Sequence, residues 1–301
     1  MGEFRAIRSG DVIARECGGF FIPWNDQRSA TFNDANEQKG KMMSDGAKTG
    51  SVAVNGTKLY YELRGAGTKL LFIAGAEGDA EEYLRVAEQL DNDFTVLSYD
   101  RRGYSRSPAP IGYSGSTVET EADDAAALLQ ALNMAPAIVW GNSSGAIIAL
   151  GLLLRHPDVV RQAMLHEPPL FSGITDVAHV LQFLKKATAN GKAPFLRMLS
   201  GNDVYNGFSE GFRARLEADS TWIQYEFNKF EYYRPSDQQL AQIKKPVAVL
   251  YGAESPPFFR EAATWLSQRL GTEPVVMAGG HGSHYDMPHE VSKIIRDLVA
   301  H

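Results

Sequence analysis

The stretch that decides the fold reads Ala137-Ile138-Val139-Trp140-Gly141-Asn142-Ser143-Ser144-Gly145, an apolar run followed by serines between glycines. It matches the pattern G-x-S-x-G, in which a serine occupies a sharp turn between a strand and a helix. Glycines suit this turn, because a side chain at either position would crowd the neighbouring strand or helix. The apolar residues 146–154 then predict a buried helix. Ser143 is therefore a candidate nucleophile, held where a base and backbone donors can reach it.

From residue 51 the sequence alternates between short apolar runs and helical stretches. Such alternation predicts an α/β fold whose mostly parallel sheet is covered by helices on both faces. The N-terminal edge is expected to be antiparallel, because the turn Asn55-Gly56 joins residues 51–54 and 58–63 as a β-hairpin. The hairpin brings the expected strands to eight, and the other six are residues 70–74, 94–99, 137–140, 163–166, 247–251 and 274–277.

The chain divides into segments of different character. Residues 1–50 are rich in charged and polar residues and in glycine, which predicts a mobile N-terminal extension. This extension fits neither a secretory signal nor a mitochondrial transit peptide, because it lacks a long apolar core and contains several acidic residues. Residues 51–170 and 246–301 form the predicted core domain. Residues 171–245 interrupt the alternation with helical segments, which predicts a helical lid inserted after the sixth strand.

The predicted lid is rich in aromatic side chains. These rings either roof an apolar substrate cavity or pack the lid onto the core domain. Trp222 is the residue that we predict to contact a substrate. The aromatic group consists of Trp222, Tyr225, Phe227, Phe230, Tyr232 and Tyr233.

Composition and charge narrow the range of partners. The chain has 301 residues, 44% of them hydrophobic and 22% charged, as in a soluble globular protein with one large α/β domain. The net charge of −6 argues against nucleic acid or an anionic membrane as the main partner. Cys17 is the only cysteine, so no internal disulfide can form, and no Cys/His set has the spacing of a zinc site. We expect a cytoplasmic protein that acts on a small molecule without a metal.

Three motifs together resemble the α/β-hydrolase family. In chain order they are Asp100-Arg101-Arg102-Gly103-Tyr104-Ser105-Arg106-Ser107, Gly141-Asn142-Ser143-Ser144-Gly145 and Gly279-Gly280-His281. The resemblance covers roughly residues 51–301 and implies that nucleophile, acid and histidine follow in that order. It implies a structural role for the arginine-rich turn. It also makes His281 the base, whereas His284, one turn later, is expected to line the site or to bind backbone.

Two glutamates are candidates for the carboxylate that orients the histidine. Glu254 follows the seventh strand, which is the usual region for the acid, but the commoner spacing would put the carboxylate at Ser255. Glu167 follows the sixth strand. A sixth-strand glutamate is the acid in the fungal lactone hydrolases that open zearalenone, which this chain resembles around residues 140–145 and 166–167. We favour Glu167 over Glu254, because the carboxylate must meet the histidine geometrically and the spacing of Glu254 is displaced.

The oxyanion hole of this fold combines two backbone N–H groups, which here belong to Ala76, in the loop after the third strand, and to Ser144. The loop itself reads Gly75-Ala76-Glu77-Gly78, where the zearalenone-type hydrolases carry an aspartate and two glycines. Zearalenone is therefore only one possible substrate. Glu77 either disfavours an anionic substrate or points to solvent.

These residues predict a serine hydrolase that needs no cofactor and cleaves an apolar ester or lactone through an acyl-enzyme on Ser143. A serine at the turn argues against dehalogenase and epoxide-hydrolase chemistry, which uses an aspartate there. Three alternatives remain open: a cofactor-free perhydrolase or carbon–carbon bond hydrolase of the same fold, a ligand receptor on a hydrolase scaffold, and a peptidase.

Overall fold

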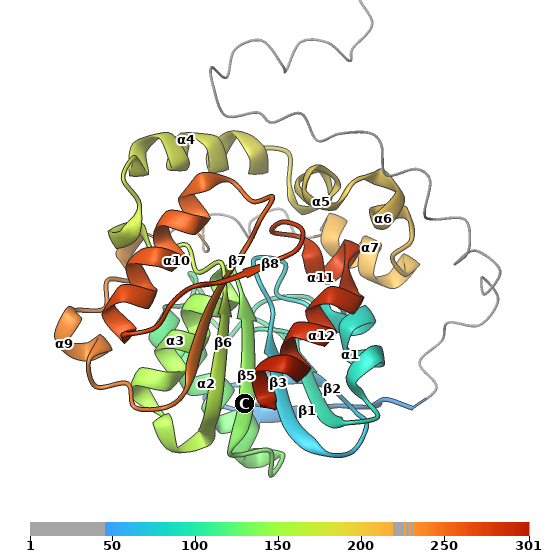
Figure 1. Cartoon of the computed structure of the whole chain (residues 1–301). Coiled ribbons are helices and arrows are strands. Elements are labelled where there is room, and N and C mark those ends of the chain that lie inside the picture. The colour runs from blue at the N-terminus through green and yellow to red at the C-terminus, as the bar shows by residue number, and fades with distance from the viewer. Residues whose placement is uncertain (1–45, 219–225, 227–228, 230, 301) are drawn as a thin grey trace, which may run out of the picture. The chain divides into compact units, whose positions relative to one another are not determined.

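The structure, a computed structural model, describes residues 46–218, 226, 229 and 231–300 (Figure 1). The predicted N-terminal extension lies outside the described residues up to position 45. Its last residues differ from the expectation, since residues 48–50 already belong to the first strand. They are ordered there because backbone pairing continues to Lys48, which lies opposite Leu63 of the second strand.

An eight-stranded sheet runs through the described residues in the order β1-β2-β4-β3-β5-β6-β7-β8. Only β2 is antiparallel to its neighbours, β1 and β4, and every other pair is parallel. The predicted fold class and its antiparallel N-terminal edge are thereby confirmed. Asn55 and Gly56, with φ of 41° and 79°, form the tight turn of the hairpin. The strands are β1 (Lys48–Val54), β2 (Thr57–Arg64), β3 (Thr68–Ile73), β4 (Phe94–Tyr99), β5 (Ala137–Asn142), β6 (Val160–His166), β7 (Val247–Gly252) and β8 (Val275–Met277).

Helices connect the strands and fill the segment predicted to be a lid. In Figure 1, α4 and α5 lie at the opposite end of the sheet from the C-terminus. The α-helices are α1 (Leu84–Leu90), α2 (Val118–Ala131), α3 (Ser144–Arg155), α4 (Val177–Thr188), α5 (Lys192–Ser200), α6 (Asn202–Asn206), α7 (Glu210–Ala218), α9 (Asp237–Leu240), α10 (Pro257–Leu270), α11 (Ser283–Asp286) and α12 (Pro288–Val299). The short 3-10 helices among the described residues are η3 (Ala80–Tyr83), η4 (Pro157–Val159) and η5 (Phe171–Gly173).

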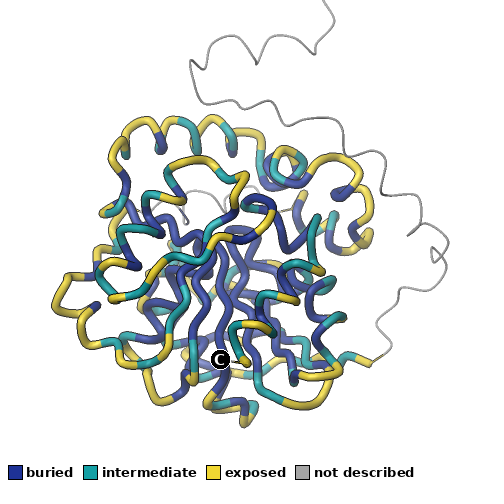
Figure 2. Tube along the Cα trace, viewed as in Figure 1, coloured by how far each residue is buried: buried dark blue, intermediate teal, exposed yellow. Residues whose placement is uncertain are grey.

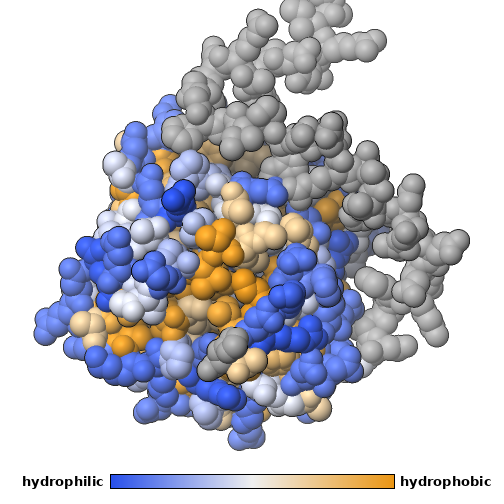
Figure 3. Space-filling view, in the orientation of Figure 1, coloured by the Kyte–Doolittle hydropathy of each residue, from blue (hydrophilic) through white to orange (hydrophobic). Residues whose placement is uncertain are grey.

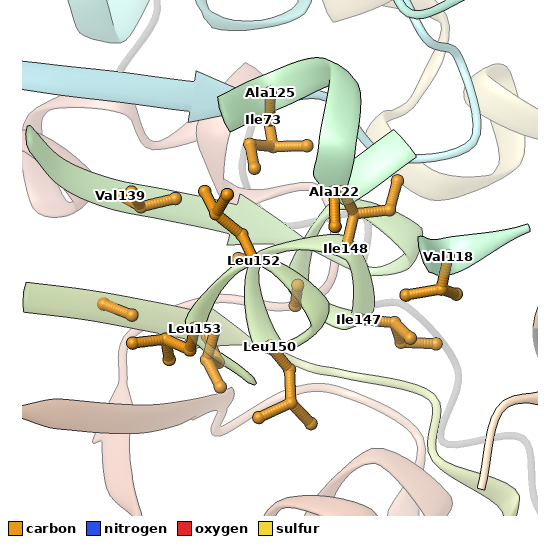
Figure 4. Packing of buried hydrophobic residues seen from close by; sticks show 14 of the residues in the cluster. Ile73, Val118, Ala122, Ala125, Val139, Ile147, Ile148, Leu150, Leu152 and Leu153 are labelled. Carbon is orange, nitrogen blue, oxygen red and sulfur yellow. The ribbon is translucent and has the colours of Figure 1, made fainter. Parts of the chain in front are cut away.

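Both faces of the sheet are buried, because successive side chains of a strand point in opposite directions. Leu71 of β3 belongs to a core formed with α2, α3 and α10. Its neighbour Leu70 belongs to a second core, formed with α1 and α12. Figure 4 shows the first core, in which Leu152 of α3 lies beside Val139 of β5. The central strands are buried, while the helices expose their outer faces (Figure 2). The packed sheet therefore fixes the positions of the residues at the ends of its strands.

A buried group of four charges ties the predicted lid segment to the core. Lys229 Nζ lies 2.7 Å from Glu226 and 2.6 Å from Glu121 of α2. Arg101 pairs with both carboxylates, and its Nε lies 3.2 Å from Glu121. Two positive and two negative charges balance, which is the arrangement in which a protein interior tolerates them. The charge of Arg101, in the arginine-rich turn, is thus paired within the fold.

The surface is mixed in polarity. Figure 3 shows hydrophilic side chains over much of one face, with apolar residues gathered near the short edge strand β8, whose Val276 is 54% exposed. Within the described ranges, every helix is too short or too polar to cross a membrane.

Candidate active site

Ser143 stands on the turn between β5 and α3, as the sequence pattern predicts. Its φ of 55° and ψ of −122° are rare for a residue with a side chain, and the turn is held by a 3.0 Å hydrogen bond from Ser143 N–H to the carbonyl of His166. The flanking glycines are required by space. A Cβ on Gly141 would lie 2.2 Å from the carbonyl oxygen of Gly145, and one on Gly145 would lie 2.1 Å from that of Ile73.

Because of this crowding, Gly145→Ala is expected to destabilise the protein by about 1–3 kcal/mol and to lower activity, since the turn or β3 must shift to admit the methyl group. Urea unfolding measures the change in the free energy of unfolding. Gly211→Ala, in α7, is the matched control, because its Cβ would meet two side-chain ends, Arg215 at 3.3 Å and Ser209 Oγ at 3.9 Å, and no backbone. Equal stability of the two variants would contradict the crowding at the turn.

The structure brings His281 together with Glu167. Glu167 directly follows β6, and its Oε2 lies 2.5 Å from His281 Nδ1. Its other oxygen accepts a 2.7 Å hydrogen bond from Gly252 N–H at the end of β7. Glu167 N–H in turn donates to the carbonyl of Leu250, at 2.8 Å. The neighbouring strands β6 and β7 therefore fix the carboxylate at the edge of the sheet where β5 presents Ser143.

The surroundings of Glu167 keep it ionised. Burial raises the pKa of its carboxyl, but the imidazole of His166 and the hydrogen bond from His281 outweigh burial, so the pKa lies below its ordinary value. Burial also lowers the pKa of His166 to about 4, which leaves His166 neutral at pH 7. At neutral pH the hydrogen bonds from His281 and Gly252 therefore stabilise the carboxylate. Such a carboxylate holds the imidazole in one tautomer, with its proton on Nδ1.

The second candidate acid lies elsewhere. Glu254 is exposed to solvent, and its backbone N–H donates to the carbonyl of Gly279 at 2.9 Å. Ser255 occupies the position where the commoner spacing would put the acid. Its side chain lowers the pKa of Glu167 and so favours the ionised form. The geometry thus gives Glu167, not Glu254, the contact with the histidine.

The predicted oxyanion donors occupy suitable elements. Ser144 is the first residue of α3, where backbone N–H groups lack partners within the helix. Ala76 lines the same cavity as Ser143. Its loop is held on one side by Glu82, both of whose oxygens accept from Gly75 N–H at 2.9 and 3.0 Å. On the other side, the buried Lys192 of α5 donates to the carbonyl of Glu77 at 3.0 Å.

Glu77 is buried, with 5% of its surface exposed, and it lines the cavity, so the expectation that it could point to solvent is wrong. The loop turns inward here because Gly78 N–H closes a 3.2 Å hydrogen bond to Gly75. Burial raises the pKa of Glu77, an effect that Lys192 and His281 partly offset.

A mainly apolar cavity of about 70 Å³ opens beside these groups. Ser143 and His281 form part of its wall. Four phenylalanines that the sequence did not single out form another part, two from the predicted lid and two from the start of α10. The lining residues on the catalytic side are Ala76, Glu77, Asn142, Ser143, His281, His284 and Tyr285, and the others are Pro169, Phe183, Leu184, Thr188, Phe195, Met198, Leu199, Pro256, Phe258 and Phe259.

Most of the aromatic group predicted to roof the cavity lies outside the described residues. Trp222, the predicted substrate contact, lies outside the described residues, as do Tyr225, Phe227 and Phe230. Tyr232 is 73% exposed and Tyr233 packs against the core formed with α2 and α3, so neither lines the cavity. The cavity residues of α4 have a signal of their own in the apolar spacing of Val180, Phe183 and Leu184, which is typical of a helix with one buried face.

Among the described residues, no three His, Cys, Asp or Glu side chains are grouped so that they could hold a metal ion. The site therefore consists of a serine, a histidine, a carboxylate, backbone donors and apolar walls.

Known proteins share this architecture. The family model of the alpha/beta hydrolase fold matches residues 69–288. The hydrolase YraK of Bacillus subtilis (strain 168) is 33% identical over 259 residues, which cover 83% of this chain and 95% of YraK. Zearalenone hydrolase of Bionectria ochroleuca is 26% identical over 249 residues, 80% of this chain and 93% of that protein. The solved enol-lactonase of Burkholderia xenovorans LB400 is 22% identical, covers 84% of this chain and 100% of its own, and has a TM-score of 0.66, a likeness of fold.

Proposed function

Because the chain belongs to the α/β-hydrolase family, we propose that it is a serine hydrolase that cleaves a neutral, apolar carboxylic ester or lactone through an acyl-enzyme on Ser143. The observation that carries the proposal is the 2.5 Å contact between His281 Nδ1 and the buried carboxyl of Glu167, beside a cavity that His281 and Ser143 both line. A histidine oriented through Nδ1 has Nε2 free to take a proton from a serine hydroxyl.

The reaction has two stages. In the first, His281 Nε2 takes the proton of Ser143 Oγ as this oxygen attacks the carbonyl carbon, and the N–H groups of Ala76 and Ser144 hold the negative oxygen. The intermediate collapses, the ester bond breaks, and His281 returns the proton to the departing alcohol. In the second stage, His281 takes a proton from water, the hydroxyl attacks the acyl carbon, and Ser143 leaves with its proton restored. A lactone follows the same route with the alcohol kept in the same molecule.

Two observations support the substrate class. The cavity walls are mostly aliphatic and aromatic, and such surface favours apolar substrate groups over charged ones. Two of the similar proteins are named a zearalenone hydrolase and an enol-lactonase. Lactones are therefore included beside open-chain esters.

An activity panel tests the function. Small aryl esters, long-chain acyl esters and macrocyclic lactones are each incubated with the native protein and with Ser143→Ala. Turnover of at least one neutral ester or lactone by the native protein alone is the expected result. Ligand binding without turnover of any of them would indicate a receptor, and turnover of a diketone or formation of a peracid in their place would indicate other chemistry on this fold.

Glu77 should set the charge preference of the site, because it is the one carboxyl group among the described residues lining the cavity. We expect Glu77→Gln to raise kcat/KM for a monoester of a dicarboxylic acid by about tenfold relative to a neutral ester of the same length, since it removes a buried negative charge near the substrate. The ratio is measured as a function of pH, because burial raises the pKa of Glu77 and only the ionised carboxyl repels an anionic group. Glu210→Gln, an exposed position in α7, is the control. An unchanged ratio would contradict this role.

A further inference from the structure

The loops of the proposed site follow strands that are far apart in the sequence, and these loops must keep a fixed spacing in the site. Residues 74–78, with the oxyanion donor Ala76, follow β3, and Ser143 follows β5, its neighbour in the sheet. His281 follows β8, so its loop reaches back past β6 and β7. Glu167 fixes the imidazole of His281, but it leaves the backbone of that loop to other contacts.

Asn142, the residue before the serine, makes one of these contacts. Its side chain is buried, and Nδ2 lies 3.3 Å from the carbonyl oxygen of His281 and 3.3 Å from Nδ1 of His284. A carbonyl oxygen only accepts, so the amide atom facing it is the nitrogen, which donates to both partners. His284 Nδ1 is therefore an acceptor without a proton.

This assignment fixes the state of His284. A ring that accepts at Nδ1 is neutral and carries its proton on Nε2. Burial is the main cause that lowers the pKa of His284, in agreement with a neutral ring. The Nε2 atom lies 3.4 Å from Oε1 of Glu82. The rings of Tyr83 and Tyr285 pack on the imidazole, with centroids 5.1 and 4.0 Å away, and limit its rotation.

Glu82 leads to the oxyanion loop. Its carboxyl oxygens accept from Gly75 N–H at 2.9 and 3.0 Å, and Gly75 directly precedes Ala76. Polar contacts thus run from the carbonyl of His281 through Asn142, His284 and Glu82 to the oxyanion loop. All three side chains are at most 3% exposed, and the reaction described above uses none of them.

We propose that Asn142, His284 and Glu82 are positioning residues, which form a buried polar chain that holds the histidine loop and the oxyanion loop in register with Ser143. The proposal rests on the proposed function for its kinetic consequences. Its geometric content, the neutral His284 with a proton on Nε2, stands independently of any activity.

Two matched substitutions of His284 each remove one of its two polar contacts, either the contact with Glu82 or the contact with Asn142. In His284→Asn the amide oxygen can replace Nδ1 toward Asn142, but the side chain is too short for Glu82. In His284→Gln the amide nitrogen can replace Nε2 toward Glu82. Each variant, and Asn142→Leu, is expected to lower kcat for a neutral ester by about 10–100-fold with KM changed less than about threefold, as is typical when residues that orient a site are lost. Ser292→Ala controls for general destabilisation, because Ser292 is buried, donates to Gln89 or to the carbonyl of His289, and is not among the residues that line the cavity.

Two readouts separate positioning from simple packing. The inhibition constant of phenylboronic acid, which forms a tetrahedral adduct with a serine, should rise in parallel with the fall in kcat. The double variant Asn142→Leu/His284→Asn should be no slower than the slower single variant, because both interrupt one chain. A change confined to KM, an unchanged boronate constant or fully additive losses would overturn the proposal.

Imidazole ¹⁵N NMR of the native protein at pH 7 tests the geometry without any variant that must fold or react. The His284 signals are first assigned by sequential labelling. The ring should be neutral, with its proton on Nε2. A proton on Nδ1, or a charged ring, would overturn the chain. If the native protein turned over no ester while the expected His284 state was found, the proposed function would fail and the chain would remain.

Discussion

Ser143→Ala is expected to lower kcat/KM for the best neutral ester by about 10⁴–10⁶-fold, because the variant keeps the cavity and the oxyanion donors but has no oxygen to form the acyl-enzyme. Steady-state kinetics with an aryl ester measures the loss. The cavity should still bind a non-hydrolysable amide analogue with native affinity, since the substitution removes one atom from the wall.

Ser267→Ala is the matched control for this result, because Ser267 is also buried but lies in α10, outside the residues that line the cavity. It should keep nearly native turnover. If Ser143→Ala retained more than about a tenth of the native rate, another group would be the nucleophile and the proposed reaction would be wrong.

Glu167→Gln is expected to lower kcat by about 10³–10⁴-fold, the second largest effect. The amide keeps an oxygen for Gly252 N–H, so the fold should persist. Its nitrogen, however, would donate to His281 Nδ1, which places the imidazole proton on Nε2 and removes the acceptor that Ser143 needs. Kinetics with the same aryl ester measures the loss, and circular dichroism verifies the fold.

Glu254→Gln provides the comparison, since the exposed Glu254 was the alternative acid. Its kcat should stay within about threefold of native. A larger loss in Glu254→Gln than in Glu167→Gln would reverse the assignment and would mean that the loop after β7 rearranges to bring Glu254 to His281.

The turn at Ser143 and the sheet around it could be predicted because their signals are local. An apolar strand, flanking glycines and an apolar helix specify the turn, and Asn55-Gly56 specifies the hairpin. The acid was harder to predict, because Glu167 follows β6 and Glu254 follows β7, and these two strands are neighbours in the sheet. Only the three-dimensional course of the loops decides which carboxylate meets His281.

The residues that line the cavity could not be predicted from composition, because they depend on how the helices pack. Most of the aromatic cluster around Trp222, the predicted cavity roof, lies outside the described residues. Phe195 in α5 and Phe259 in α10 line the cavity, and their sequence context did not single them out. Glu77 and Glu226 illustrate the same limit. Glutamate is usually a surface residue, yet both side chains are buried. A tight loop buries Glu77, and ion pairs with Arg101 and Lys229 allow the burial of Glu226.

The most direct test of the central claim is the mass of the protein during turnover. The native protein is mixed with an excess of an aryl ester whose acyl group leaves slowly, quenched in acid within the first turnover, and analysed intact and after digestion. We predict an added mass equal to one acyl group, located on the peptide that contains Ser143. Release of the alcohol with no acyl group on the protein, or with the acyl group on a different residue, would contradict a serine hydrolase acting through Ser143.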